Sequence, residues 1–91
     1  MLIQWLRYNK RLPISIEVGT DDGEYIVMLC SLIVKDNLEA IHIPPRGQQI
    51  MLVNEKSGDP ENPQATSIIG RRVCGDVVII SPDVWARMEG C

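Results

Sequence analysis

The sequence contains no phenylalanine, and only two tryptophans and two tyrosines accompany its many aliphatic residues. A core built on stacked aromatic rings is therefore excluded, and Ile, Val and Leu must supply most of the buried volume. Because β-branched side chains pack well on a pleated surface, this composition favours strands. With 91 residues, the chain is expected to form one hydrophobic core and one domain, residues 1–91.

Residues that bind metals or perform catalysis are also scarce. The chain has one histidine, His42, and its three cysteines form no Cys-x-x-Cys pair, so the spacing of a metal site is missing. No imidazole stands beside a nucleophile and no glycine-rich phosphate loop is present, which predicts a protein that is not an enzyme and holds no cofactor. The odd cysteine count fits reduced thiols, and we expect a cytoplasmic location in a bacterial cell.

Basic residues are fewer than acidic ones: the chain has nine Lys and Arg against twelve Asp and Glu, which gives a net charge of −3. Non-specific nucleic-acid binding needs a field of basic side chains, so no direct nucleic-acid partner is expected. No apolar run approaches the roughly 18 residues of a membrane span, and the first seven residues are too short and polar for a signal peptide. We therefore expect no membrane association.

The first half of the chain predicts a strand followed by a helix. Apolar residues alternate over 12–18, beginning with Leu12, and indicate a strand with Pro13 at its start or at a sheet edge. Residues 2–8 fit either a strand or an irregular arm. After the turn cluster at 19–23, the spacing of apolar residues over 24–34 predicts a short helix, with a strand as the alternative because of its β-branched content.

The second half predicts strands at 38–43, 49–56 and 73–80, with the first two joined in a hairpin. The continuously apolar residues 77–80 indicate a central strand buried on both faces. Asn62 and Pro63 predict the start of a helix over 64–69, Gly70 its end, and Ser81 the start of a final helix. The predicted fold is α+β: a small mixed or antiparallel sheet in βαββαβα order, with two or three short helices packed on one face.

Polar residues gather at strand ends and at a helix start around the loop 57–63, where they are free of the core. The candidate binding residues here are Arg46, Asn54, Glu55, Asn62 and Thr66. The alternative is that Asn62 only caps its helix and that Glu55 is only solvated.

Two further pairs are candidates for contact with a partner. Arg71 and Arg72 are suited to an acidic partner or a phosphate, or they act only as helix-end charges. Trp5 and Trp85 are candidates for an interface because Trp is enriched there, although in a chain without Phe both fit a core role equally well.

Several short motifs carry a resemblance. They are Leu29-x-x-Leu32, Asn37-Leu38-Glu39-Ala40-Ile41, Leu52-Val53-Asn54-Glu55, Asn62-x-x-Ala65-Thr66 and Gly75-Asp76-Val77-Val78-Ile79. Over residues 25–80 the chain resembles a family of short uncharacterised proteins found mostly in bacterial phages, prophages and plasmids. It departs from that family where Val34-Lys35-Asp36 replaces a double glycine, and the first 24 residues have no counterpart. The resemblance implies a mobile genetic element as the setting and no particular activity.

These observations give two leading hypotheses. The first is a small non-enzymatic binding protein that docks on a host macromolecule, with a host protein as partner, and blunts a defence or regulatory system. Its acidic charge would help it to occupy a basic groove. The alternative is a homo-oligomer that builds pockets between protomers and sequesters a small molecule such as a nucleotide.

Overall fold

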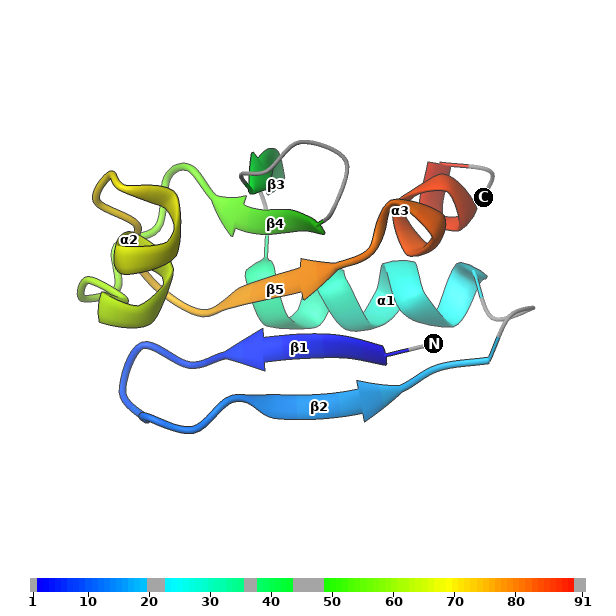
Figure 1. The fold of residues 1–91 in the computed structure, drawn as a ribbon, viewed down its shortest axis with the longest axis horizontal. Coiled ribbons are helices and arrows are strands. Elements are labelled where there is room, and N and C mark those ends of the chain that lie inside the picture. Colours follow the sequence, from blue (N-terminus) through cyan, green and yellow to red (C-terminus); the bar gives the residue numbers. More distant parts are fainter. Residues whose placement is uncertain (1, 20–22, 36–37, 44–48, 90–91) are drawn as a thin grey trace.

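The computed structural model describes residues 2–19, 23–35, 38–43 and 49–89 and shows an α+β fold, as predicted: a five-stranded antiparallel sheet with three helices (Figure 1). The elements are β1 (Leu2–Leu6), β2 (Ile14–Glu17), α1 (Gly23–Val34), β3 (Leu38–Ile43), β4 (Gln49–Asn54), α2 (Pro63–Ile69), β5 (Val77–Ile80) and α3 (Pro82–Glu89). No helix within these described ranges has the length and apolar character needed to cross a membrane.

The strand β5 lies at the centre of the sheet, whose order is β2-β1-β5-β4-β3. It pairs antiparallel with β1 on one side and with β4 on the other, and Val78 faces Trp5 and Leu52 across the two ladders. All four of its residues are buried, which confirms the prediction from its continuous apolar run. The hairpin of β3 and β4 is confirmed as well, and residues 2–6 form a strand that pairs with β2.

Helices cover both faces of the sheet, which corrects the expectation that they share one face. Helices α1 and α3 pack on the face that carries Ile3, Val78 and Ile50. Helix α2 packs near one end of the opposite face, because its Ala65 and Ile69 join a second cluster. The sheet residues in that second cluster are Leu6, Ile43, Met51, Val53, Val77 and Ile79, together with Ile41 at its margin.

Local sequence explains how the helices begin and end. In α1, the buried residues Ile26, Cys30 and Val34 recur every four positions and form one face, so helical packing outweighs the β-branched content. Asn62 caps α2, and Gly70 ends it in the left-handed conformation with φ 84°. Ser81 caps α3, since its Oγ accepts a hydrogen bond from the backbone N–H of Val84 at 3.3 Å.

Three strand boundaries differ from the prediction. Leu12 precedes β2 and is 77% exposed. Of the apolar residues that alternate over 12–18, only later ones such as Ile16 and Val18 pack under α1 and α3. Strand β4 ends at Asn54 because the side chain of Asn54 accepts a hydrogen bond from the N–H of Lys56 and turns the chain. Strand β5 begins only at Val77, after Gly75 has taken a positive φ of 79°.

The thiol of Cys30 is buried between α1 and the sheet, and this burial raises its pKa from 9.0 to about 11. The unfolded chain ionises this thiol near pH 9, whereas the folded chain keeps it neutral up to about pH 11. Its contribution to stability is therefore complete below pH 9 and is lost as the pH rises from 9 to 11.

The free energy of unfolding, measured with urea across this pH range, should fall more steeply with pH for the wild type than for Cys30→Ala. Equal slopes would contradict the prediction.

Candidate functional site

Four of the predicted site residues line one polar cleft of about 180 Å³, at the end of the sheet where β4 finishes. They are Asn54, Glu55, Arg71 and Arg72, and the sequence placed them in two segments that the fold brings together. The remaining lining residues were not predicted: Glu39, Val53, Ser57, Val73 and Cys74.

The wall formed by the β4 end is shaped by two side-chain turns. The Oδ1 of Asn54 accepts from the N–H of Lys56 at 2.9 Å, and the Oγ of Ser57 accepts from the N–H of Asp59 at 3.2 Å. Both are local contacts that polar residues make in place of a continued strand. They leave Glu55 exposed at the rim, where no described residue pairs with its carboxylate.

The opposite wall carries the two arginines, which follow the left-handed end of α2. Arg71 Nη2 lies 2.8 Å from Glu39 Oε1, and Arg72 Nε lies 3.7 Å from Glu61 Oε1. The arginine side chains are 59% and 74% exposed, so each pair contributes at most about 1 kcal/mol to stability. Because these ion pairs are weak, each arginine can leave its carboxylate partner and bind an acidic group of a ligand instead.

The cleft offers charged groups of both signs to a ligand. Its lining carries two carboxylates and two guanidinium groups, and the thiol of Cys74 has no imidazole among the lining residues to activate it. Across the described residues, no three His, Cys, Asp or Glu side chains are grouped so that they could hold a metal ion. A small polar molecule with groups of both signs matches this lining.

Asn62 and Thr66, the other two predicted site residues, hold the fold together. The side chain of Asn62 is fully buried: its Nδ2 donates to the carbonyls of Leu6 and Gly75, and its Oδ1 accepts from the N–H of Ala65. Both hydrogens of Nδ2 and the oxygen Oδ1 are therefore bonded to the backbone of the protein. The Thr66 Oγ1 accepts from the N–H of Val73 at 2.9 Å.

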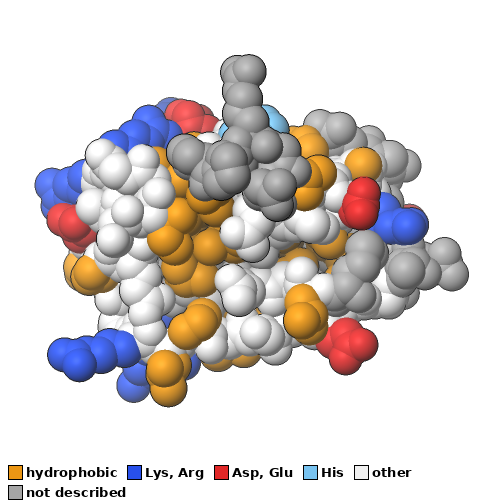
Figure 2. All heavy atoms as spheres, in the orientation of Figure 1, with side chains coloured by type: hydrophobic (Ala, Val, Ile, Leu, Met, Phe, Trp, Pro, Cys, Tyr) orange, Lys and Arg blue, Asp and Glu red, His pale blue; other side chains and the backbone are white. Residues whose placement is uncertain are grey.

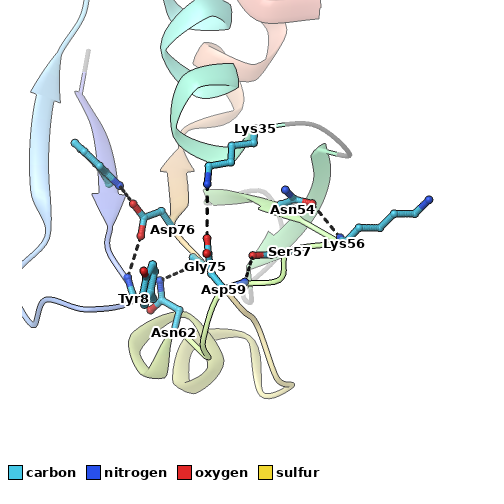
Figure 3. A network of polar contacts seen from close by, with 10 residues as sticks. Tyr8, Lys35, Asn54, Lys56, Ser57, Asp59, Asn62, Gly75 and Asp76 are labelled. Atoms are coloured by element: carbon cyan, nitrogen blue, oxygen red, sulfur yellow. Dashed lines mark hydrogen bonds and ion pairs between the residues drawn. The ribbon is translucent and has the colours of Figure 1, made fainter.

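A second group of contacts fixes the chain just before β5 (Figure 3). The carboxylate of Asp76 accepts from Trp5 Nε1 at 3.0 Å and from the N–H of Tyr8 at 3.1 Å. Gly75 is required beside it, because its φ is positive and an added Cβ would lie 2.6 Å from Ser57 Oγ. Position 75 therefore has no room for a side chain.

The remaining candidates divide between the core and the part of the chain that is not described. The Trp5 indole is half-buried and bonded to Asp76, with the Arg7 guanidinium 5.8 Å from its ring, and Trp85 packs against the cluster under α1. Both side chains therefore make contacts within the protomer, and their role at an interface stays a prediction. Arg46 lies outside the described residues.

One exposed surface was not predicted from the sequence. On the outer side of α1, Tyr25, Met28 and Leu32 are 45%, 52% and 70% exposed. Their spacing places them on one face, opposite the buried Ile26, Cys30 and Val34. We call these three residues the α1 stripe. The sequence signal for this exposed surface is that α1 carries apolar residues around its whole circumference, a pattern typical of helices that are covered on both sides.

Replacing Asn62 should destabilise the protein strongly. Asn62→Ala leaves three buried backbone groups unpaired, and we expect a loss of about 3 kcal/mol in the free energy of unfolding. Asn62→Asp keeps the cap but points carboxylate oxygens at two carbonyls, so its loss should be larger at pH 7 than at pH 4, where a protonated carboxyl can donate. Urea unfolding measures both, with the exposed Ser67→Ala as a near-neutral control. A wild-type stability for Asn62→Asp would contradict this role.

No protein-family model, curated protein or solved structure matches this chain. The motif resemblance over residues 25–80 stays a prediction, and the surfaces that the fold creates carry the information on function.

Proposed function

We propose that this chain is a non-enzymatic binding protein that docks on a host macromolecule through the α1 stripe. The observation that carries the proposal is the exposure of Tyr25, Met28 and Leu32 on a helix that is already packed on its other side. Contiguous apolar surface on a small domain marks sites of interaction. Methionine and tyrosine are well suited to such a face, because the first adapts its shape and the second adds a polar end.

The charges around the stripe indicate the chemistry of the partner. Glu24, in the first turn, is the one charged residue within α1. Lys35 follows the helix directly, and its Nζ lies 3.8 Å from Asp59 Oδ2. The helix itself therefore offers a partner negative charge and no positive charge. We propose a host protein whose surface is apolar at its centre and basic at its rim, which the net charge of −3 would help to attract.

The motif resemblance supports the setting of this interaction. The resemblance implies a mobile genetic element in a bacterium, so the partner that we propose belongs to the host cell. Docking on a basic surface would block that surface for its normal ligand. On this proposal, the protein inhibits a defence or regulatory component of its host by occupancy alone.

The test compares two matched substitutions on exposed helix positions. Leu32→Asp disrupts the stripe, whereas Ile68→Asp changes an exposed residue of α2, on the opposite face of the sheet. Wild-type protein and Ile68→Asp should retain the same host protein from a bacterial lysate, and Leu32→Asp should lose it. With that partner purified, calorimetry should show a Kd at least tenfold weaker for Leu32→Asp, as expected for a central apolar contact.

Two outcomes would overturn the proposal. One is equal binding of the partner by Leu32→Asp. The other is a wild-type homodimer, seen by analytical ultracentrifugation and lost in Leu32→Asp, because a second copy would then cover the stripe. Retained circular dichroism and unfolding behaviour of Leu32→Asp would exclude a folding defect, which is not expected at a side chain that is 70% exposed.

A second candidate function is favoured by the polar cleft, which collects Asn54, Glu55, Arg71 and Arg72. Its volume of about 180 Å³ lies below the about 300 Å³ at which pockets for whole small molecules begin. A nucleotide would therefore need a cleft completed by another protomer. We propose this as the alternative: an oligomer that sequesters a small, polar, phosphate-bearing molecule.

Thermal unfolding tests the alternative. At ten times its Kd, a bound nucleotide adds about 1.4 kcal/mol and should raise the Tm by about 5–10 °C. The double substitution Arg71→Gln and Arg72→Gln should abolish the shift, and Lys56→Gln, outside the cleft lining, should leave it. An unchanged Tm with ATP, GTP and inorganic phosphate would remove this candidate.

A further inference from the structure

Charge is unevenly distributed along the chain. The first 16 residues contain Arg7, Lys10 and Arg11 and no acid, since Glu17 is the first acidic residue of the sequence. The remaining 75 residues hold all twelve acids and six of the nine bases. The hairpin that joins β1 to β2 is therefore a basic element on an acidic protein.

A groove lies between α2 and the sheet on the face opposite α1. It has a volume of about 510 Å³, within the range of sites that bind ligands. Its lining is mostly apolar, and Figure 2 shows apolar side chains along this face beside α2. The floor is formed by Gln4, Leu6 and Ile79 of the sheet, and the walls by Pro63, Gln64, Ser67 and Ile68 of α2 and by Pro13 before β2.

The groove continues into a second hollow against the basic hairpin. Both hollows are lined by Pro63 and Gln64, and the second adds the hairpin residues Tyr8, Asn9, Lys10 and Arg11. The side chain of Gln64 donates a hydrogen bond to the carbonyl of Arg11, which ties α2 to the hairpin. In Figure 2, basic side chains project at the lower left, where Figure 1 places this hairpin.

The two ends of the groove differ in charge. No described acid pairs with Lys10 or Arg11, both of which are exposed at one end. Along β1, away from the hairpin, Leu2 shares a face with Gln4 and is 61% exposed, and its partner across the strands is Glu17. The groove thus passes from positive charge, across an apolar centre, to an exposed leucine beside a carboxylate.

We propose that this groove binds an acidic, apolar segment of another protein. Bulky aliphatic side chains of the segment fill the space between Leu6, Ile68 and Ile79, and an Asp or Glu at one end pairs with Lys10 and Arg11. The apolar centre of the groove favours a peptide over a nucleic acid, because it has no aromatic ring on which bases could stack, and the basic end adds only the ring of Tyr8. The site is separate from the α1 stripe, which lies on the other side of the sheet.

A random dodecapeptide library displayed on phage, selected on immobilised wild-type protein, tests this inference without a known partner. The enriched peptides should combine two or more large aliphatic residues with acidic residues clustered at one end. A fluorescein-labelled consensus peptide then serves as the probe in fluorescence anisotropy. Its affinity should fall as ionic strength rises from 50 to 300 mM, since exposed charges are screened in that range.

Three variants distinguish this groove from other surfaces. The double charge reversal Lys10→Glu and Arg11→Glu and the single Ile68→Asp should each raise the Kd of the probe at least tenfold. Leu32→Asp should bind the probe like the wild type, although it disrupts the α1 stripe, so the two proposals fail independently. The inference is overturned if no peptide is enriched, if the consensus lacks acidic residues, or if the charge reversal leaves the Kd unchanged. Unaltered circular dichroism would show that the variants are folded.

Discussion

The buried amide of Asn62 is the contact on which the surfaces of this protein depend. It joins the end of β1, the start of α2 and the turn before β5, and its backbone N–H adds a 2.7 Å bond to the carbonyl of Val73. These bonds fix α2 against one face of the sheet. Because α2 forms a wall of the apolar groove and ends at the arginines of the polar cleft, both hollows rely on one side chain that lines neither of them.

The two faces of the sheet are covered by helices to different extents. Under α1 and α3, aliphatic side chains from all five strands pack together, and helix α1, which covers them, remains apolar on its outer side. On the other face, a helix of only seven residues covers one end. The chain thus exposes an apolar stripe with an acidic end on one side and an apolar groove with a basic end on the other. On the two proposals made above, each face binds its own partner.

Local chemistry made several elements predictable. Asn62, Pro63 and Gly70 mark the limits of α2 with residues that suit those backbone positions, and the run 77–80 identified the central strand. Long-range arrangement was not predictable in this way. The side of the sheet that α2 occupies depends on strand order, and strand order is set by pairings between residues about 70 positions apart, such as Trp5 with Val78.

The same distinction applies to the candidate site. Asn54, Glu55, Arg71 and Arg72 could be chosen because they are polar residues at the ends of elements. Glu39 could not, because it lies within a strand and reaches the cleft only through the pairing of β3 with β4. Asn62 was chosen for its polarity, and its burial shows that the same amide suits a structural role when carbonyls surround it.

The position of β5 also constrains the order of assembly. The hairpins β1–β2 and β3–β4 are local in sequence and can pair early, but in the described sheet β5 lies between them and pairs with both. Until β5 is inserted, the inner edges of β1 and β4 present unpaired backbone groups, and such edges recruit strands from other chains. Because closing the sheet requires contacts between distant residues, folding should be slow for a chain of this length. The period before β5 docks is therefore when this protein is most exposed to aggregation, and chaperone binding to the open edges would protect it at that stage.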